Sequence, residues 1–427
     1  MEEQEIIYKK VILVGVDTGE EADFEHSMEE LQELAKAAYK QVVGIIVQKK
    51  RDIDKALYVG TGKVEEIKEF IPLVEAEEIV FDNTLSPSQI RNLGQELELP
   101  IIDRTNLILD IFALRAKTKE AKLQVETARL QYMLPRLVGM RENLSRQGGA
   151  GGSMSNKGAG ETKLELDRRK IEHRIHILKK ELEDIAQTRE TMRKRRSRSA
   201  VPQVALVGYT NAGKSTIMNR LVECGCENKE KTVFEKDMLF ATLETNVRTI
   251  HTGDNKPFFL ADTVGFINKL PHGLVKAFHS TLEEVRYADL LLHVVDFSDE
   301  HYRTQIEVTE DTLRELDAQD IPRVIVYNKA DKVESFAIPQ KKDNRVYISA
   351  KTGVGIDELI ELIKSSVYTN QMEVEFLIPY QKGSLVSYFL ENETVLSQEH
   401  LPEGVLLKVR CDENILHKYG IYRHNAE

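Results

Sequence analysis

Four short motifs in the middle of this chain carry the residue types that phosphate and base recognition require. The first is Gly208-Tyr-Thr-Asn-Ala-Gly-Lys-Ser215, whose glycines let backbone N–H groups turn inward around phosphate at a helix N-terminus. Lys214 would reach the β- and γ-phosphates of a nucleotide, and the Ser215 hydroxyl would bind Mg²⁺. The expected phosphate-binding residues are Gly208, Tyr209, Thr210, Asn211, Ala212, Gly213, Lys214, Ser215 and Thr216.

The second motif, Asp262-Thr-Val-Gly265, stands at the end of a strand candidate. Asp262 would hold the Mg²⁺ ion through water, and the Gly265 N–H would sense the γ-phosphate. These two motifs predict that Lys214 and Gly265 act in catalysis and that Ser215 and Asp262 belong to the metal site.

A threonine should complete the metal site from the segment between these two motifs, and the sequence offers several. The candidates are Thr232, Thr242, Thr245 and Thr249. We favour Thr242, as both metal ligand and catalytic group, because it stands just before the strand candidate 246–250. The expected switch residues are Phe240, Ala241, Thr242, Leu243, Glu244, Asp262, Thr263, Val264 and Gly265.

The last two motifs, Asn328-Lys-Ala-Asp331 and Ser349-Ala-Lys351, select the base. The Asp331 carboxylate can accept hydrogen bonds from N1 and N2 of guanine, whereas adenine would leave that carboxylate unpaired. Lys329 would cover the ring, and the Ala350 N–H would meet guanine O6. The order of the four motifs therefore predicts a guanine-nucleotide site whose base is held by Asn328, Lys329, Ala330, Asp331, Ser349, Ala350 and Lys351.

Phe266 follows Gly265 directly, where many GTPases have a glutamine that orients the attacking water. Phenylalanine cannot polarise water, although its ring could pack the switch region. Another residue, a monovalent cation or a partner must then assist hydrolysis, and Asn211 is a candidate K⁺ ligand. We therefore expect a low intrinsic rate of GTP hydrolysis.

These motifs need a sheet that brings them to one edge. Apolar strands at 204–207, 258–261, 290–295, 324–327 and 346–348 each end near a motif, as in a doubly wound parallel sheet. The pattern of short strands and amphipathic helices before residue 110 predicts a second, mostly parallel α/β domain. We expect four regions in this α/β protein: an α/β domain at 1–110, a helical hairpin at 111–198, a G domain at 199–368 and a small α/β domain at 369–427.

The predicted hairpin differs from the rest of the chain in charge. Residues 111–200 carry 22 Lys and Arg against 11 Asp and Glu, whereas the whole chain has a net charge of −11. We expect one helix over 111–147, kinked or ended by Pro135, a glycine-rich loop at 148–160, and a second helix over 161–198. A glycine-rich tip of this length is uncommon in a purely structural hairpin, so the composition favours RNA as the partner over a solvated coiled coil.

Targeting and redox features are few. Cys224, Cys226 and Cys411 do not form a disulfide framework, and no apolar run is long enough to cross a membrane. The acidic N-terminus lacks a signal-peptide pattern. We expect a monomeric cytoplasmic protein without a membrane span, and leave peripheral membrane contact open.

Further segments resemble the HflX family of GTPases from about residue 10 to residue 368. The similar segments are Tyr58–Lys63, Lys122–Glu126, Leu130–Arg136, Gly158–Glu165, Asp167–Arg169, Gly208–Thr216, Phe240–Glu244 and Asp262–Ile267. The segment Cys224–Lys231 departs from the family pattern, which leaves the details of the switch loop open.

The resemblance implies a ribosome-associated GTPase that binds the large subunit and splits or rescues ribosomes under stress. It also implies that the hairpin reaches rRNA near the peptidyl transferase centre and that the ribosome stimulates hydrolysis. Some members also use ATP, and some paralogues are linked to antibiotic resistance. A signalling GTPase with the hairpin as a protein-docking surface remains the alternative. An RNA-modifying enzyme lacks a catalytic constellation outside the G domain.

Overall fold

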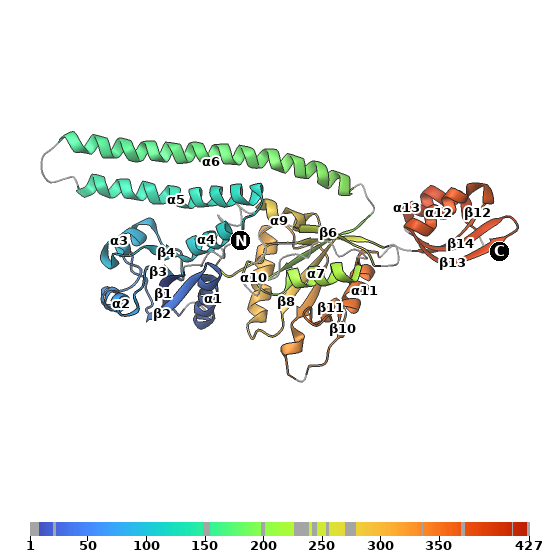
Figure 1. The fold of residues 1–427 in the computed structure, drawn as a ribbon, viewed down its shortest axis with the longest axis horizontal. Helices are drawn as coiled ribbons and strands as arrows, with labels where there is room; N and C mark the ends of the chain where they lie inside the picture. The colour runs from blue at the N-terminus through green and yellow to red at the C-terminus, as the bar shows by residue number, and fades with distance from the viewer. Residues whose placement is uncertain are drawn as a thin grey trace, which may run out of the picture. The chain divides into compact units, whose positions relative to one another are not determined.

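The computed structural model describes residues 8–19, 23–147, 154–197, 201–225, 239–240, 246–252, 256–269, 279–334, 336–368, 372–411 and 413–424. The chain divides into two compact units, coloured along the sequence in Figure 1. Unit 1 comprises Met1–Arg193, Lys236–Glu244 and Ile267–Thr281. Unit 2 comprises Lys194–Glu235, Thr245–Phe266 and Leu282–Glu427.

The N-terminal part of unit 1 is the predicted α/β domain. Its four strands are all parallel and lie in the order β2-β1-β3-β4. Apolar side chains of the strands pack with those of helices α2 and α3 in one core cluster, which explains the near-continuous burial of β1 and β3. The elements are β1 (Lys9–Asp17), α1 (Phe24–Ala37), β2 (Lys40–Lys49), α2 (Thr61–Val74), β3 (Glu78–Phe81), α3 (Pro87–Leu97), β4 (Ile101–Asp103) and α4 (Arg104–Arg115).

Two long antiparallel helices follow, α5 (Lys119–Gln147) and α6 (Met154–Ser197), which belong to unit 1 up to Arg193 (Figure 1). Ion pairs join them at Glu126–Arg174, 2.8 Å, and at Glu120–Arg189, 2.6 Å. The 44 residues of α6 correspond to a length of about 66 Å at 1.5 Å per residue. The predicted helical hairpin is therefore present.

Two details of the predicted hairpin were wrong, and one of the two alternatives at Pro135 is excluded. The first helix does not run unbroken over 111–147, because Ala116 is extended and the Thr118 hydroxyl accepts the Ala121 N–H as a new N-cap. Pro135 lies inside α5 without ending it, since proline removes only one helical hydrogen bond. Helix α6 begins at Met154 rather than 161, because each glycine costs a long helix only about 1 kcal/mol.

A buried carboxylate attaches α5 to the N-terminal sheet. Asp103, at the end of β4, is fully buried. Its carboxylate accepts hydrogen bonds from Tyr132 Oη at 2.5 Å and from Arg136 Nη2 at 3.1 Å, both on α5. Hydrogen bonds to a charged group are among the stronger ones, so the hairpin starts from a rigid support.

The sheet of unit 2 has seven strands in the order β10-β11-β9-β8-β5-β7-β6. Strands β6 and β10 are antiparallel to their neighbours, and the other adjacent pairs are parallel. This order confirms the predicted doubly wound GTPase sheet. Its elements are β5 (Gln203–Gly208), α7 (Lys214–Gly225), β6 (Asn246–Ile250), β7 (Phe258–Asp262), α9 (His279–Arg286), β8 (Leu290–Asp296), α10 (Tyr302–Glu315), β9 (Arg323–Asn328), β10 (Gln340–Lys342), β11 (Arg345–Tyr347) and α11 (Ile356–Val367).

The C-terminal segment forms a small antiparallel sheet in the order β12-β14-β13. Its core contains Phe376 and Phe389, whose rings are stacked 5.0 Å apart. Strands β12 and β14 carry the buried apolar side chains, whereas most residues of β13 are exposed. The elements are β12 (Met372–Ile378), α12 (Gly383–Asn392), β13 (Thr394–Leu401), β14 (Gly404–Cys411) and α13 (Glu413–Tyr419).

Within the described part of the chain, no helix has both the length and the apolar character that crossing a bilayer requires.

One buried histidine makes the stability of the G domain depend on pH. Burial in β8, together with the positive charges of Arg323 and Lys214, lowers the pKa of His293 to about 4. Its Nδ1 atom has no hydrogen-bond partner among the residues that the structure describes. The folded state therefore contains neutral His293 under conditions in which the unfolded chain binds a proton.

We predict that the free energy of unfolding of the G domain falls by about 2 kcal/mol between pH 7 and pH 5 because of His293 alone. Urea denaturation at both pH values should show a smaller fall in His293→Leu. The exposed His251 provides the control, because His251→Leu should keep the wild-type pH dependence. Equal falls in the wild type and in His293→Leu would contradict the prediction.

Candidate guanine-nucleotide site

The predicted phosphate loop lies between β5 and α7. Backbone angles in the left-handed region occur at Asn211, with φ +59°, and at Gly213, with φ +94°. A Cβ atom on Gly213 would lie 2.2 Å from Asn328 Nδ2, so only glycine fits at this position. The loop therefore has the glycine-dependent turn that a backbone phosphate cradle needs.

Lys214, the first residue of α7, is buried in this loop. Its Nζ donates to the carbonyl oxygens of Gly208 at 3.0 Å and Tyr209 at 2.7 Å. Burial lowers the pKa of Lys214 to about 8, while nearby Asp262 raises it. A phosphate beside this ammonium would offset the cost of its burial, so the position suits an anionic ligand.

Ser215 and Asp262 lie together beside the loop. Ser215 Oγ donates to Asp262 Oδ2 at 2.8 Å, and Asp262 is fully buried at the end of β7. A hydroxyl and a carboxylate are hard oxygen ligands of the kind that Mg²⁺ prefers, and Mg²⁺ usually keeps several waters. Across the described ranges no group of three His, Cys, Asp or Glu side chains is placed to hold a metal ion.

The Thr210 side chain adds an independent sign that this loop accepts a ligand. Its Oγ1 atom is buried and has no hydrogen-bond partner in the described part of the protein. Buried hydroxyls without partners are rare in folded proteins. An oxygen-rich ligand such as a phosphate would supply the missing hydrogen bond.

The base-recognition motifs are joined by the Asn328 side chain. Its Nδ2 donates to Ala212 O at 2.9 Å, and its Oδ1 accepts the Ala350 N–H at 2.9 Å. The Ala350 amide thus has a protein acceptor, and its contact with guanine O6 stays a prediction. Lys329 Nζ lies 2.7 Å from Asp296 Oδ2, and the Asp331 side chain is exposed.

The predicted switch residues lie in different environments. Thr242, Ala241, Leu243 and Glu244 fall outside the described residues, as does Thr232. Phe240 is buried in unit 1, and its ring meets that of Phe112 on α4 edge-on, with ring centroids 4.8 Å apart. The Thr263 hydroxyl donates to Leu206 O at 2.6 Å, which fixes β7 to β5 rather than presenting this group to a ligand.

Four family profiles match consecutive parts of the chain. They are the GTP-binding GTPase N-terminal region over residues 25–113, the GTP-binding GTPase middle region over 115–196, the 50S ribosome-binding GTPase over 203–329 and the HflX C-terminal domain over 336–416. The GTPase HflX of Caldanaerobacter subterraneus subsp. tengcongensis is 44% identical over 414 residues, covering 96% of this chain and 94% of its own. The chain belongs to the HflX family of GTPases.

Another relative agrees with this assignment, and a solved structure is also similar to the chain. The GTPase HflX of Escherichia coli K12 is 41% identical over 408 residues, covering 94% of this chain and 93% of its own. A GTP-binding protein from Sulfolobus solfataricus, solved with GDP, is 25% identical with a TM-score of 0.43, and the match covers 84% of this chain and 99% of that one. The match over nearly the whole length of the HflX relatives shows that all four sequence regions belong to one family.

As an HflX-family GTPase, the protein converts GTP to GDP and phosphate. P-loop GTPases use Mg²⁺, which neutralises charge on the phosphates when bound. Ser215 and Asp262, which share a hydrogen bond, would hold this ion, and the buried Lys214 ammonium would meet the phosphate oxygens. The side chain of Phe266 is itself buried and supplies no polar group.

Sequence reasoning missed one residue of this site in the HflX-family G domain. Arg220, on α7, donates from Nε to Ala350 O at 2.9 Å and from Nη2 to Lys351 O at 2.7 Å. The guanidinium thus fixes the loop whose Ala350 N–H is expected at guanine O6. Its position six residues after Lys214, on a helix leading away from the phosphates, gave no motif signal.

We predict that Arg220→Met lowers the affinity for GDP and GTP about tenfold, because two charge-assisted hydrogen bonds to the loop are lost. Fluorescence titration would measure this. A 2-aminopurine nucleotide lacks the 6-oxo group and should lose less affinity than guanine nucleotides. Glu223→Gln is the control, since it removes only the surface ion pair of Arg220 at 2.9 Å. Equal losses for both bases would contradict a role in base recognition.

Proposed function

We propose that this HflX-family GTPase binds the large ribosomal subunit and uses GTP binding to split or rescue ribosomes under stress. The observation that carries the proposal is the basic hairpin attached to the GTPase. Residues 111–200 have a net charge of +11 and the rest of the chain has −22, so a polyanion such as rRNA would be attracted to one region only.

The structure of the hairpin supports this use. Many of its charged residues pair with each other, such as Arg168–Glu172 at 2.8 Å, and such exposed pairs contribute little to stability. Lys179 and Lys180 are exposed on the middle of α6. The basic run 193–198, Arg-Lys-Arg-Arg-Ser-Arg, includes the last residues of α6 and concentrates positive charge in this part of the sequence. Phosphate contacts of this kind give affinity without sequence selectivity.

The match to the profile described as 50S ribosome-binding GTPase supports the same partner. We propose that the ribosome also accelerates hydrolysis, because Phe266 cannot orient water and the protein must obtain this assistance elsewhere. A K⁺ ion near Asn211, whose side chain is exposed on the phosphate loop, is a second source that we propose. Hydrolysis rates in KCl and NaCl would separate the two sources.

We predict that the protein co-sediments with large ribosomal subunits in a non-hydrolysable GTP analogue and does so less in GDP. Replacing the five basic residues of 193–198 with glutamine should weaken binding. It should also lower the slope of log K against log salt by about 0.7 to 0.9 for each lost phosphate contact.

Lys341 and Lys342, both exposed on β10, provide the matched control. Their replacement with glutamine removes positive charge outside the hairpin and should leave binding to subunits unchanged. Binding that does not depend on the nucleotide would overturn the proposal. Unchanged binding by the 193–198 variant would favour a protein partner that docks on the hairpin.

A further inference from the structure

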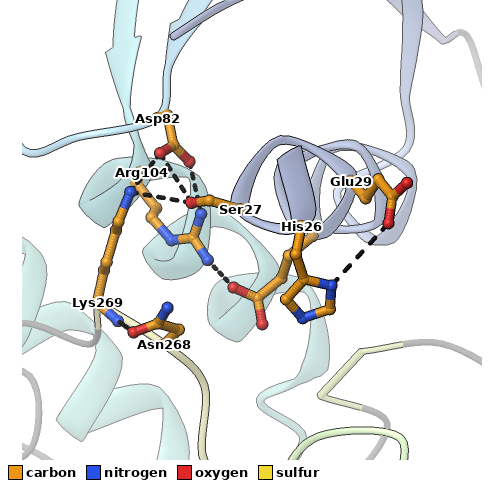
Figure 2. A network of polar contacts seen from close by, with 8 residues as sticks. His26, Ser27, Glu29, Asp82, Arg104, Asn268 and Lys269 are labelled. Atoms are coloured by element: carbon orange, nitrogen blue, oxygen red, sulfur yellow. Dashed lines mark hydrogen bonds and ion pairs between the residues drawn. The ribbon is translucent and has the colours of Figure 1, made fainter. Parts of the chain in front are cut away.

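The segment that follows the Asp262–Gly265 motif is held by the N-terminal domain. Lys269 lies four residues after Gly265 and belongs to unit 1. Its Nζ lies 2.5 Å from Asp82 Oδ2 and 2.9 Å from Ser27 Oγ, as Figure 2 shows. Its backbone has φ +56°, and its N–H donates to Asn268 Oδ1 at 2.9 Å. A non-glycine residue with positive φ is held in place by its surroundings, here by an ion pair.

The N-terminal charge cluster that receives Lys269 consists of Glu30, Asp82 and Arg104. Asp82 directly follows β3 and is 0% exposed, and Arg104 on α4 is 1% exposed. Arg104 lies beside Asp82 in Figure 2, and its Nη1 donates to Asp82 Oδ1 at 2.7 Å. Its Nη2 donates to Glu30. The two carboxylates that pair with Arg104 are both buried, since Asp82 is 0% and Glu30 is 7% exposed.

Among the contacts that the structure describes, Lys269 adds a positive charge to a cluster of two carboxylates and one guanidinium. Two carboxylates and one guanidinium leave a net charge of −1, and the Lys269 ammonium brings the sum to zero. A buried charge without compensation is strongly unfavourable. The N-terminal domain is thus most stable when the segment after Gly265 stays in contact with it.

The other end of this segment rests on the phosphate loop. The Phe266 carbonyl accepts the Thr210 N–H at 2.7 Å, and the Phe266 N–H donates to Gly208 O at 3.1 Å. A Cβ atom on Gly265 would lie 2.9 Å from Lys214 Nζ, so the backbone here leaves little room beside that ammonium. A γ-phosphate between Lys214 and Gly265 would need more room than this arrangement leaves beside the ammonium.

We propose that Lys269 is a positioning residue that makes the nucleotide preference of the G domain depend on the N-terminal domain. Only three residues separate Gly265 from Lys269, which limits their separation to about 14 Å. The Lys269–Asp82 pair favours the arrangement in which the Phe266 carbonyl accepts a hydrogen bond from the Thr210 N–H. The pair therefore lowers the affinity for GTP relative to GDP. Because coupling is reciprocal, bound GTP weakens the contact between Lys269 and the N-terminal charge cluster.

The test compares dissociation constants for a non-hydrolysable GTP analogue and for GDP. Lys269→Met should raise the GTP affinity relative to GDP about fivefold or more. Lys269→Arg, which keeps the charge, should restore the wild-type ratio. The control is Lys63→Met, because Lys63 pairs with Glu66 at 2.6 Å and has a similar side-chain exposure of 19%, against 21% for Lys269. An unchanged ratio in Lys269→Met would overturn the proposal.

A second variant separates this effect from damage to the fold. Lys269→Met combined with Asp82→Asn removes one positive and one negative charge together and keeps the contact between Arg104 and Glu30. The double variant should regain the thermal stability lost in Lys269→Met and still show the altered affinity ratio. A stable double variant with the wild-type ratio would show that Lys269 acts only on stability, which contradicts the proposal. Since no ribosome is present, the outcome does not depend on the proposed ribosomal role.

Discussion

The buried amide of Asn328 joins three motifs that are distant in sequence. It bonds to Ala212 in the phosphate loop, 116 residues away, and to Ala350 in the second base loop, 22 residues away. Both polar atoms of the side chain are used, so its loss would leave buried groups unpaired. Gly213 can have no side chain because this amide stands against it. The guanine-nucleotide site depends on this single contact for its shape.

The parallel sheet brings these loops to one edge. Strands β7, β5, β8 and β9 lie side by side in parallel, so the residues at their C-terminal ends meet there. Lys214 and Asp262 contribute opposite charges to the same buried volume, and each partly offsets the cost of burying the other. The Asp262 carboxylate therefore helps the buried Lys214 to keep the positive charge that phosphate binding needs.

The N-terminal sheet uses its C-terminal edge in a different way. Asp82 follows β3 and Asp103 ends β4, and Phe81 pairs directly with Asp103 between these adjacent strands. One carboxylate holds the segment after Gly265 through Lys269, and the other holds the basic hairpin through Tyr132 and Arg136. Arg104 follows Asp103 directly and bonds to Asp82. The segment after Gly265 and the basic hairpin are therefore both attached to neighbouring residues at the same edge of the N-terminal sheet.

The amino-acid sequence was enough to predict the GTPase sheet, the parallel N-terminal sheet and the hairpin. Strand–loop–helix patterns and fixed motif spacings are local properties that residue types report directly. The sequence pattern did not predict the break at residues 116–118, because a threonine that caps a helix has the same residue type as one inside a helix. Only the tertiary structure showed that Arg220 supports the base loop, that Phe240 packs on Phe112, and that Lys269 completes a buried charge cluster. Such contacts join residues far apart in the chain, and in one sequence an exposed lysine and a lysine that neutralises a buried carboxylate look the same.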